Sequence, residues 1–127
     1  MGQAKILLVE DNGLLREWIR NCLEGYGFCV AAPPSVSEAL HLAAARPFDV
    51  VVTDWHLTDG WDGFQVLAQV RKEHPQVPSV LISAEADAEL VHRAQCAGFD
   101  SVLQKPFPPC NIAATLHRLV KAGEEPR

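Results

Sequence analysis

Short apolar runs alternate with segments of helical periodicity along most of the chain. Each apolar run is followed by apolar residues spaced three and four apart, which places them on one face of a helix. Pro and Gly separate the units, and Gly98 is expected to end the fourth helix. The pattern predicts strands over residues 6–9, 28–32, 48–53, 80–82 and 101–103, and helices over roughly 14–23, 36–44, 64–70, 90–94 and 112–120.

The apolar runs are continuous rather than alternating, which is typical of strands that are buried on both faces. Continuous apolar strands that alternate with helices predict a parallel sheet covered by helices on both sides, joined by right-handed crossovers. We therefore expect one α/β domain of five β-α units over residues 1–127, with a core from about residue 5 to residue 120. Residues 122–127 are expected to form a frayed tail.

Composition narrows the classes of function. The chain has 48% hydrophobic and 21% charged residues, as globular proteins do, and a net charge of −5. Its 11 Lys and Arg residues are scattered, which argues against direct binding of DNA or RNA. No apolar run approaches the length of a membrane span, and the start of the chain lacks the pattern of a signal peptide, so we expect a cytoplasmic protein.

Polar residues follow four of the five predicted strands. In an open parallel sheet, ligands bind beyond the carboxyl ends of the strands. Glu10 and Asp11 follow the first strand and Asp54 follows the third, while Ser83 and Lys105 follow the fourth and fifth. These side chains are therefore expected to meet at one edge of the sheet.

Crowded carboxylates repel one another unless a cation is present. A hard divalent ion with oxygen ligands, Mg²⁺ or Mn²⁺, suits such a site, and Mg²⁺ is typically held by one or two carboxylates and a phosphate. Lys105 and Ser83 offer a positive charge and a hydroxyl to that phosphate. Asp54 could then act as a nucleophile toward phosphorus and form an aspartyl-phosphate.

Six motifs stand in order on the five units: Val9-Glu10-Asp11-Asn12, Val52-Thr53-Asp54, Asp62-Gly63-Phe64, Leu81-Ile82-Ser83-Ala84, Ala97-Gly98 and Lys105-Pro106-Phe107. Together they resemble the response-regulator receiver domain, the phosphoacceptor domain of two-component signalling, from about Lys5 to Val120. The resemblance implies a flavodoxin-like fold with strand order 2-1-3-4-5, the known order of a chemotaxis regulator of this family.

The resemblance also implies a role for each site residue. Asp54 is the implied phosphoacceptor, and Lys105 pairs with the phosphoryl group. Asp11 and Asp54 ligate Mg²⁺ together with the backbone carbonyl of His56, and Glu10 assists through water.

Further positions are implied to regulate the reaction. Ser83 stands at the switch position, where its hydroxyl turns toward the phosphoryl group, and Val102 stands where many members have a switching aromatic residue. The side chains of His56 and Glu85, with Ala84, flank the route of the hydrolysing water and modulate phosphoryl lifetime. The bond before Pro106 is implied to be cis, the isomer that only X-Pro bonds adopt cheaply.

The implied function is a phosphorylation switch rather than a separate enzyme. A histidine kinase or phosphotransfer protein supplies the phosphoryl group, and the domain has intrinsic autophosphorylation and autodephosphorylation activity only. The fourth helix, fifth strand and fifth helix, about Asp87 to Val120, form the expected contact surface for a downstream protein. A weak homodimer also fits the family.

Two departures from the family pattern stand out. The segment after Asp54 is one residue longer than usual and lacks a Pro, and Gly60 adds freedom, so we expect a looser loop there. Val102 has one stiff torsion and little area to move, which weakens the usual aromatic readout.

Two other functions stay open. A degenerate receiver would bind partners without phosphorylation, as Val102 and the altered loop favour. An Asp-nucleophile phosphohydrolase is less favoured, because such enzymes commonly carry a second Asp where His56 stands. The chain could be a stand-alone regulator or a fragment of a larger protein.

Overall fold

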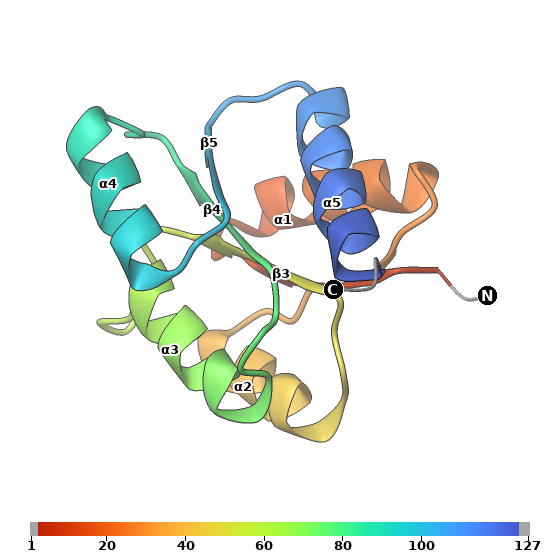
Figure 1. Cartoon of the computed structure of the whole chain (residues 1–127), viewed down its shortest axis with the longest axis horizontal. Helices are drawn as coiled ribbons and strands as arrows, with labels where there is room; N and C mark the ends of the chain where they lie inside the picture. The colour runs from red at the N-terminus through yellow and green to blue at the C-terminus, as the bar shows by residue number, and fades with distance from the viewer. Residues whose placement is uncertain (1–2, 125–127) are drawn as a thin grey trace.

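The structure, a computed structural model, describes residues 3–124 and alternates strands with helices along the chain (Figure 1). The strands are β1 (Lys5–Val9), β2 (Cys29–Ala31), β3 (Val50–Asp54), β4 (Ser79–Ser83) and β5 (Ser101–Gln104). The helices are α1 (Gly13–Gly25), α2 (Val36–Ala45), α3 (Gly63–Glu73), α4 (Ala88–Ala97) and α5 (Pro109–Glu124). None of these helices is long and apolar enough to cross a membrane.

The five strands form one parallel sheet in the order β2-β1-β3-β4-β5, which confirms the predicted fold class and strand order. All residues of β3 and β4 are buried, as continuous apolar strands require, whereas β2 lies at the edge and is partly exposed. Each strand therefore delivers its carboxyl end to the same side of the molecule.

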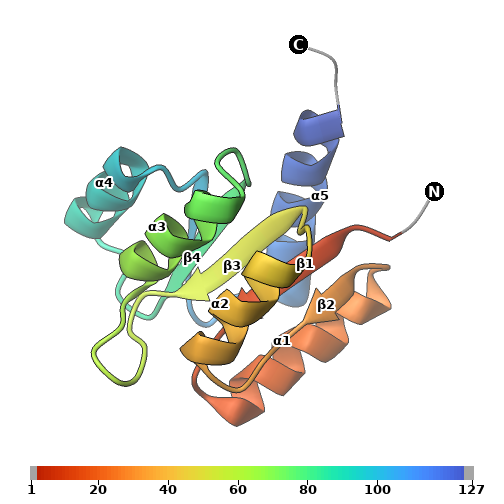
Figure 2. The same cartoon turned by 90° about the horizontal axis from the view of Figure 1, so that it is seen from below.

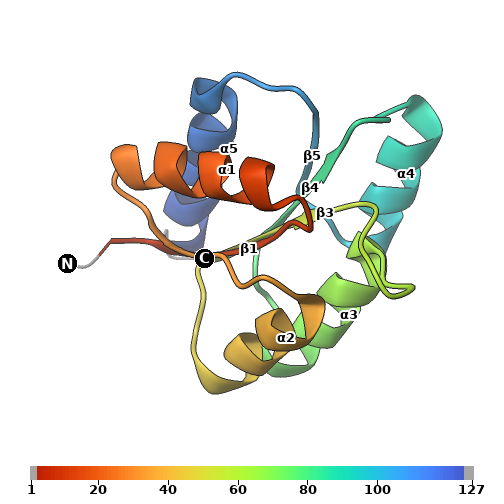
Figure 3. The same cartoon turned by 180° about the vertical axis from the view of Figure 1, so that it is seen from behind.

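Helices cover both faces of the sheet. Helices α1 and α5 lie together on one face, and α2, α3 and α4 lie on the other (Figures 1 and 3). Side chains of β1 alternate between these layers, so that Ile6 and Leu8 join the α1–α5 core while Leu7 and Val9 join the core under α2 and α3. The two cores fix the sheet between them.

Local sequence explains where the helices begin and end. The residue before each of the first four helices accepts a hydrogen bond from the backbone N–H three positions later, which satisfies a free donor of the first turn. Gly98 ends α4 with φ of 101°, a left-handed conformation that Gly adopts without strain. The four capping residues are Asn12, Ser35, Asp62 and Asp87.

The structure corrects one predicted boundary. Helix α5 continues to Glu124, beyond the predicted end near residue 120, so residues 122–124 of the expected frayed tail are helical. Residues 125–127 of that tail lie outside the described residues. Local composition suggested fraying, but no Pro stands between Pro109 and Pro126 to end the helix earlier.

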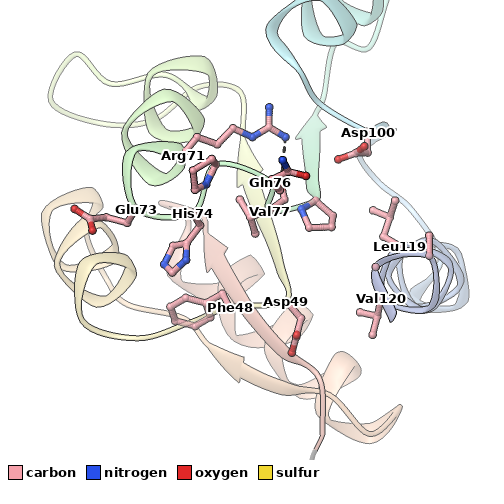
Figure 4. A pocket seen from close by; sticks show the side chains of 14 residues that line it. Phe48, Asp49, Arg71, Glu73, His74, Gln76, Val77, Asp100, Leu119 and Val120 are labelled. Atoms are coloured by element: carbon pink, nitrogen blue, oxygen red, sulfur yellow. Dashed lines mark hydrogen bonds between the residues drawn. The ribbon is translucent and has the colours of Figure 1, made fainter. Parts of the chain in front are cut away.

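A hollow of about 710 Å³ lies at the amino-terminal edge of the sheet, away from the predicted site (Figure 4). Arg71 of α3 lines it and uses its guanidinium within the fold, donating to the carbonyls of Val77 at 3.0 Å and Gly98 at 2.9 Å. His74 also serves the fold, because its Nε2 lies 2.6 Å from the carbonyl of Ala43. These contacts tie α3 to the end of α4 and to α2.

Gly63 is required by close packing at the start of α3. A Cβ there would lie 2.6 Å from the carbonyl oxygen of Asp54 and 2.7 Å from Cδ1 of Leu81. Gly63→Ala is therefore expected to lower the free energy of unfolding by about 1–3 kcal/mol, measured by urea denaturation. The control is Gly25→Ala, where a Cβ meets nothing within 4 Å. An equal loss in both variants would contradict this packing role.

Candidate functional site

The predicted site residues gather at the carboxyl edge of the sheet. Glu10 follows β1, Asp54 ends β3, Ser83 ends β4 and Lys105 follows β5. Figure 2 shows the end of β3 leading into the projecting segment before α3. The side chains of Glu10, Asp54 and Ser83 are almost fully buried, with residue exposures of 3%, 7% and 1%. Parallel strand order alone thus brings together groups that are far apart in sequence.

One ammonium group lies between two buried carboxylates. Lys105 Nζ donates to Oδ2 of Asp54 and to Oε1 of Glu10, each at 3.0 Å. The pairs join positions 51 and 95 residues apart in the sequence. Charged hydrogen bonds of this kind are strong where water is excluded, so Lys105 holds both acids at the edge of the sheet.

The backbone supports this arrangement. The N–H of Asn12 donates to Oε2 of Glu10 at 3.3 Å, and the guanidinium of Arg16 donates to the carbonyl of Glu10 at 3.0 Å. The hydroxyl of Thr53 donates to the carbonyl of Asp54 at 3.1 Å. Both acids are therefore fixed from more than one direction.

One lysine cannot balance the local negative charge. Burial, followed by the hydrogen bond and charge of Asp54, raises the pKa of Glu10 to about 7, although Lys105 acts in the opposite direction. Burial lowers the pKa of Lys105, but its bonds to Asp54 and Glu10 outweigh that effect and leave this pKa above its ordinary value. Lys105 is thus a cation, and of the two acids that it contacts, Glu10 is the one whose pKa is raised, because its ionised form is disfavoured.

Asp11 lies half-buried beside the same cluster. Burial is the main cause that raises its pKa, and the charges of Asp54 and Asp59 add to it, while hydrogen bonds from Thr58 oppose it. Within residues 3–124, no three His, Cys, Asp or Glu side chains gather closely enough to form a metal site by themselves. An excess of buried carboxylate oxygen nevertheless fits a hard cation that keeps several waters, as Mg²⁺ does.

Ser83 has a defined hydrogen bond at the end of β4. Its Oγ accepts from the N–H of Glu85 at 3.0 Å, and its carbonyl accepts from the N–H of Lys105 at 2.8 Å. Ala84 and Glu85 are exposed beyond it. The peptide bond between Lys105 and Pro106 is cis, the geometry that the resemblance implies.

The segment after Asp54 forms a tight hairpin rather than the loose loop expected from Gly60. The N–H of Trp61 donates to the carbonyl of Thr58, and the N–H of Leu57 donates to the carbonyl of Trp61, both at 3.2 Å. Asp59 and Gly60 have φ of 58° and 78°. Asp-Gly is a preferred pair for a turn with two positive φ angles, so the sequence carried this signal and we overlooked it. The His56 side chain is exposed at the base of the hairpin.

Sequence reasoning also missed an aromatic cluster next to Asp54. The rings of Trp55 and Phe64 lie 4.6 Å apart, and the guanidinium of Arg93 lies 5.3 Å from the centre of each ring. Val102 is half-buried and packs against the same cluster of buried residues as Trp55 and Phe64. No short motif marks these contacts, because the residues come from three separate elements.

The family profile of the response regulator receiver domain matches residues 6–117 of this chain. The chain belongs to this family. The receiver domain is 32% identical over 119 residues to chemotaxis protein CheY-3 of Vibrio cholerae, covering 91% of this chain and 90% of that protein. It is also 34% identical over 113 residues to KdpE, a transcriptional regulatory protein of Escherichia coli, with 89% of this chain covered.

Solved structures agree with this assignment. The receiver domain of Francisella response regulator 1452 has a TM-score of 0.88 at 26% identity, covering 96% of this chain and 100% of that one. The non-phosphorylated HemR receiver domain of Leptospira biflexa has a TM-score of 0.84 at 30% identity, covering 98% of each chain. Receiver domains are signalling domains of two-component response regulators, not enzymes with a separate substrate.

Some relatives are considerably longer than this receiver domain. The chain spans 49% of KdpE and 24% of PilR, a response regulator protein of Pseudomonas aeruginosa. It spans nearly all of CheY-3. Membership of the family thus concerns the receiver domain itself.

The excess charge at Glu10 predicts a pH dependence in metal-free protein. An acid whose native pKa is about 7, against an ordinary 4.5, binds more protons in the native state than in the unfolded state between these values. The free energy of unfolding should therefore fall as pH rises from about 4.5 to 7. In Glu10→Gln this fall should shrink, leaving the variant about 1–3 kcal/mol more stable than the parent near pH 8.

Urea denaturation in the presence of a chelator measures this effect at each pH. Glu73→Gln is the matched control, since Glu73 is exposed and outside the acidic cluster. A Glu10→Gln variant that is less stable than the parent near pH 8 would show that Glu10 is a net stabilising partner of Lys105.

Proposed function

We propose that Asp54 accepts a phosphoryl group from a histidine kinase or phosphotransfer protein in a Mg²⁺-dependent reaction, and that the phosphorylated domain binds its partners differently. The observation that carries this proposal is the buried carboxylate of Asp54 held 3.0 Å from Lys105 Nζ beside a second acid. Membership of the receiver family supports it.

Phosphoryl transfer requires little more than positioning and charge stabilisation. A carboxylate oxygen of Asp54 attacks phosphorus, an O–P bond forms, and the P–N bond to the donor histidine breaks. The imidazole nitrogen leaves with the electron pair and takes up a proton. Lys105 stabilises the negative charge on the phosphoryl oxygens, since its ammonium already contacts the attacking group. Attack by water on phosphorus later releases phosphate and restores the carboxylate of Asp54.

Mg²⁺, or Mn²⁺ in its place, would be held by Asp11, Asp54 and the backbone carbonyl of His56, with Glu10 assisting through water. The raised pKa values of Glu10 and Asp11 support this assignment, because they reflect negative charge that a bound cation would relieve. When bound, the ion neutralises charge on the phosphoryl oxygens. The side chains of this domain then only have to hold the cation and aim the Asp54 oxygen.

An apolar surface beside Lys105 supports a protein as the phosphoryl donor. Leu15, Trp18, Ala84 and Phe107 line a shallow hollow of about 480 Å³ together with Lys105 itself. Trp18 is 42% exposed here, and the neighbouring Leu14 is 87% exposed. Exposed large apolar groups next to a reactive site are typical of protein contact surfaces.

The readout proposed for the phosphorylated state begins at Ser83. Rotation of its hydroxyl toward a phosphoryl oxygen would end its hydrogen bond with Glu85 and alter the segment that leads into α4. The surface formed by α4, β5 and α5 would then present the change to a downstream protein or a second copy of the chain. Val102 favours one alternative, a receiver that binds partners without phosphorylation.

Acetyl phosphate with Mg²⁺ should add one phosphoryl group to the domain, detected by intact-mass measurement. Asp54→Asn should show no adduct, because the amide is not a nucleophile toward phosphorus, and omission of Mg²⁺ should also abolish it. Asp49→Asn, at the opposite edge of the sheet, is the control and should be phosphorylated normally. An unmodified parent protein would favour the phosphorylation-independent module, and turnover of many phosphate esters would favour a phosphohydrolase.

His56 and Glu85 are expected to lengthen the phosphoryl lifetime. Both side chains are exposed beyond the buried Asp54, on the two segments that follow β3 and β4. Removing their bulk opens the approach to water, so the double variant His56→Ala and Glu85→Ala should lose its phosphoryl group about threefold faster, or ~0.6 kcal/mol in barrier. Timed intact-mass measurement gives the rate, His41→Ala with Glu73→Ala is the control, and an unchanged rate would contradict the shielding role.

A further inference from the structure

Helix α4 buries fewer residues against the sheet than its neighbour α3. Only Leu90 and Ala94 of α4 are buried, whereas α3 buries Gly63, Val66, Leu67 and Val70. Figure 3 shows α4 at the periphery of the fold, beyond α3. A helix with little buried area is held largely by the contacts at its margins, so those contacts decide its position.

One such contact joins α4 to α3 and to the residue after Asp54. The guanidinium of Arg93 lies 5.3 Å from the ring centres of both Trp55 and Phe64. The two rings are 4.6 Å apart and tilted by 53°, and Phe64 continues to Phe99 at 5.8 Å. We call the contact of Arg93 with Trp55 and Phe64 the α3–α4 clasp.

The aromatic side of the clasp is fixed by the backbone. The N–H of Trp55 donates to the carbonyl of Ile82 at 2.9 Å, and the carbonyl of Trp55 accepts from the N–H of Gly63 at 2.9 Å. Trp55 is thereby tied to β4 and α3, directly beside the candidate phosphoacceptor. Any movement of α4 relative to the sheet therefore changes the contact between Arg93 and a tryptophan whose backbone is held in place.

The charge of Arg93 has no competing ionic partner among residues 3–124, where the ion pairs involve only Arg20 and Lys105 as cations. A guanidinium over an aromatic face is attracted by the negative face of the ring, and two rings strengthen the attraction. Val102, at the position where many receivers carry an aromatic residue, packs against the same buried cluster as the two rings. The rings of Trp55 and Phe64 thus provide aromatic contacts near α4 that the small side chain of Val102 does not provide.

We propose that the α3–α4 clasp sets the resting position of α4 and is the contact that phosphorylation releases. This role depends on the proposed phosphorylation of Asp54. In the resting state, Ser83 tethers the N–H of Glu85 and Arg93 tethers the body of α4. When the Ser83 hydroxyl turns to a phosphoryl oxygen, the first tether is lost, and α4 then moves by opening the second. Arg93 thus acts through α4 as a positioning residue, without contact with the phosphoryl group.

Hydrogen–deuterium exchange of the unphosphorylated protein in chelator tests the resting role. In Arg93→Ala and Arg93→Met, amides of residues 88–97 should exchange about fivefold faster than in the parent. This is the size of effect expected for loss of a cation–π contact made by an exposed arginine. Arg93→Lys should restore part of the protection, since an ammonium keeps the charge. Arg118→Ala, an exposed arginine of α5, is the control. Unchanged exchange in α4 in both neutral variants would overturn the resting role.

The switching role is tested with acetyl phosphate and Mg²⁺. Phosphorylation of the parent should raise exchange in α4, and unphosphorylated Arg93→Ala should already lie near that raised level, with a smaller further increase on phosphorylation. Equal increases in the parent and Arg93→Ala would overturn the switching role. Absence of any mass adduct in the parent would instead refute phosphorylation of Asp54, and the exchange data in chelator would still decide whether the clasp holds α4.

Discussion

The carboxyl edge of the sheet holds more acidic groups than basic ones, and this imbalance constrains the rest of the site. Glu10 and Asp54 are buried and share a single ammonium, that of Lys105, and Asp11 adds negative charge beside them. Burial makes each ionised acid costly, so the pKa of Glu10 rises to about 7. A site of this kind is incomplete by its own chemistry. It favours any ligand that brings positive charge, and Lys105 holds the carboxylate of Asp54 in a fixed place.

The packing of the parallel sheet offsets the free-energy cost of burying the acids at its carboxyl edge. Continuous apolar strands bury β3 and β4 completely and bring their carboxyl ends to one edge, where residues far apart in the chain meet. The two cores on either side of the sheet supply the stability that a repulsive cluster removes. Close packing extends to the backbone, since Gly63 leaves no room for a Cβ against the carbonyl of Asp54.

The sequence was sufficient to predict the fold and the gathering of Glu10, Asp54 and Lys105, because both follow from which residues end each apolar strand. It was not sufficient for features that depend on contacts between elements. Trp18 shares the apolar spacing of α1, but the face of α1 that meets the sheet is formed by Ile19 and Leu23, and Trp18 lies at its margin near Phe107. The Arg93 contact joins three elements and has no sequence signature. The hairpin after Asp54 was predictable from the pair Asp59-Gly60, which favours a tight turn, whereas the missing Pro alone suggested a looser loop.

These features have a common consequence for how the domain can change shape. Helix α1 buries two large side chains, Ile19 and Leu23, in a core that it shares with α5, whereas α4 buries one large side chain, Leu90, and the small Ala94, and adds the contact of Arg93. Deformation follows the softest contacts, so a change at the carboxyl edge is expected to travel toward α4 rather than toward α1. The same edge places Trp55 next to Asp54 in the chain. A single peptide unit therefore joins the buried carboxylate of Asp54 to the ring that Arg93 of α4 contacts.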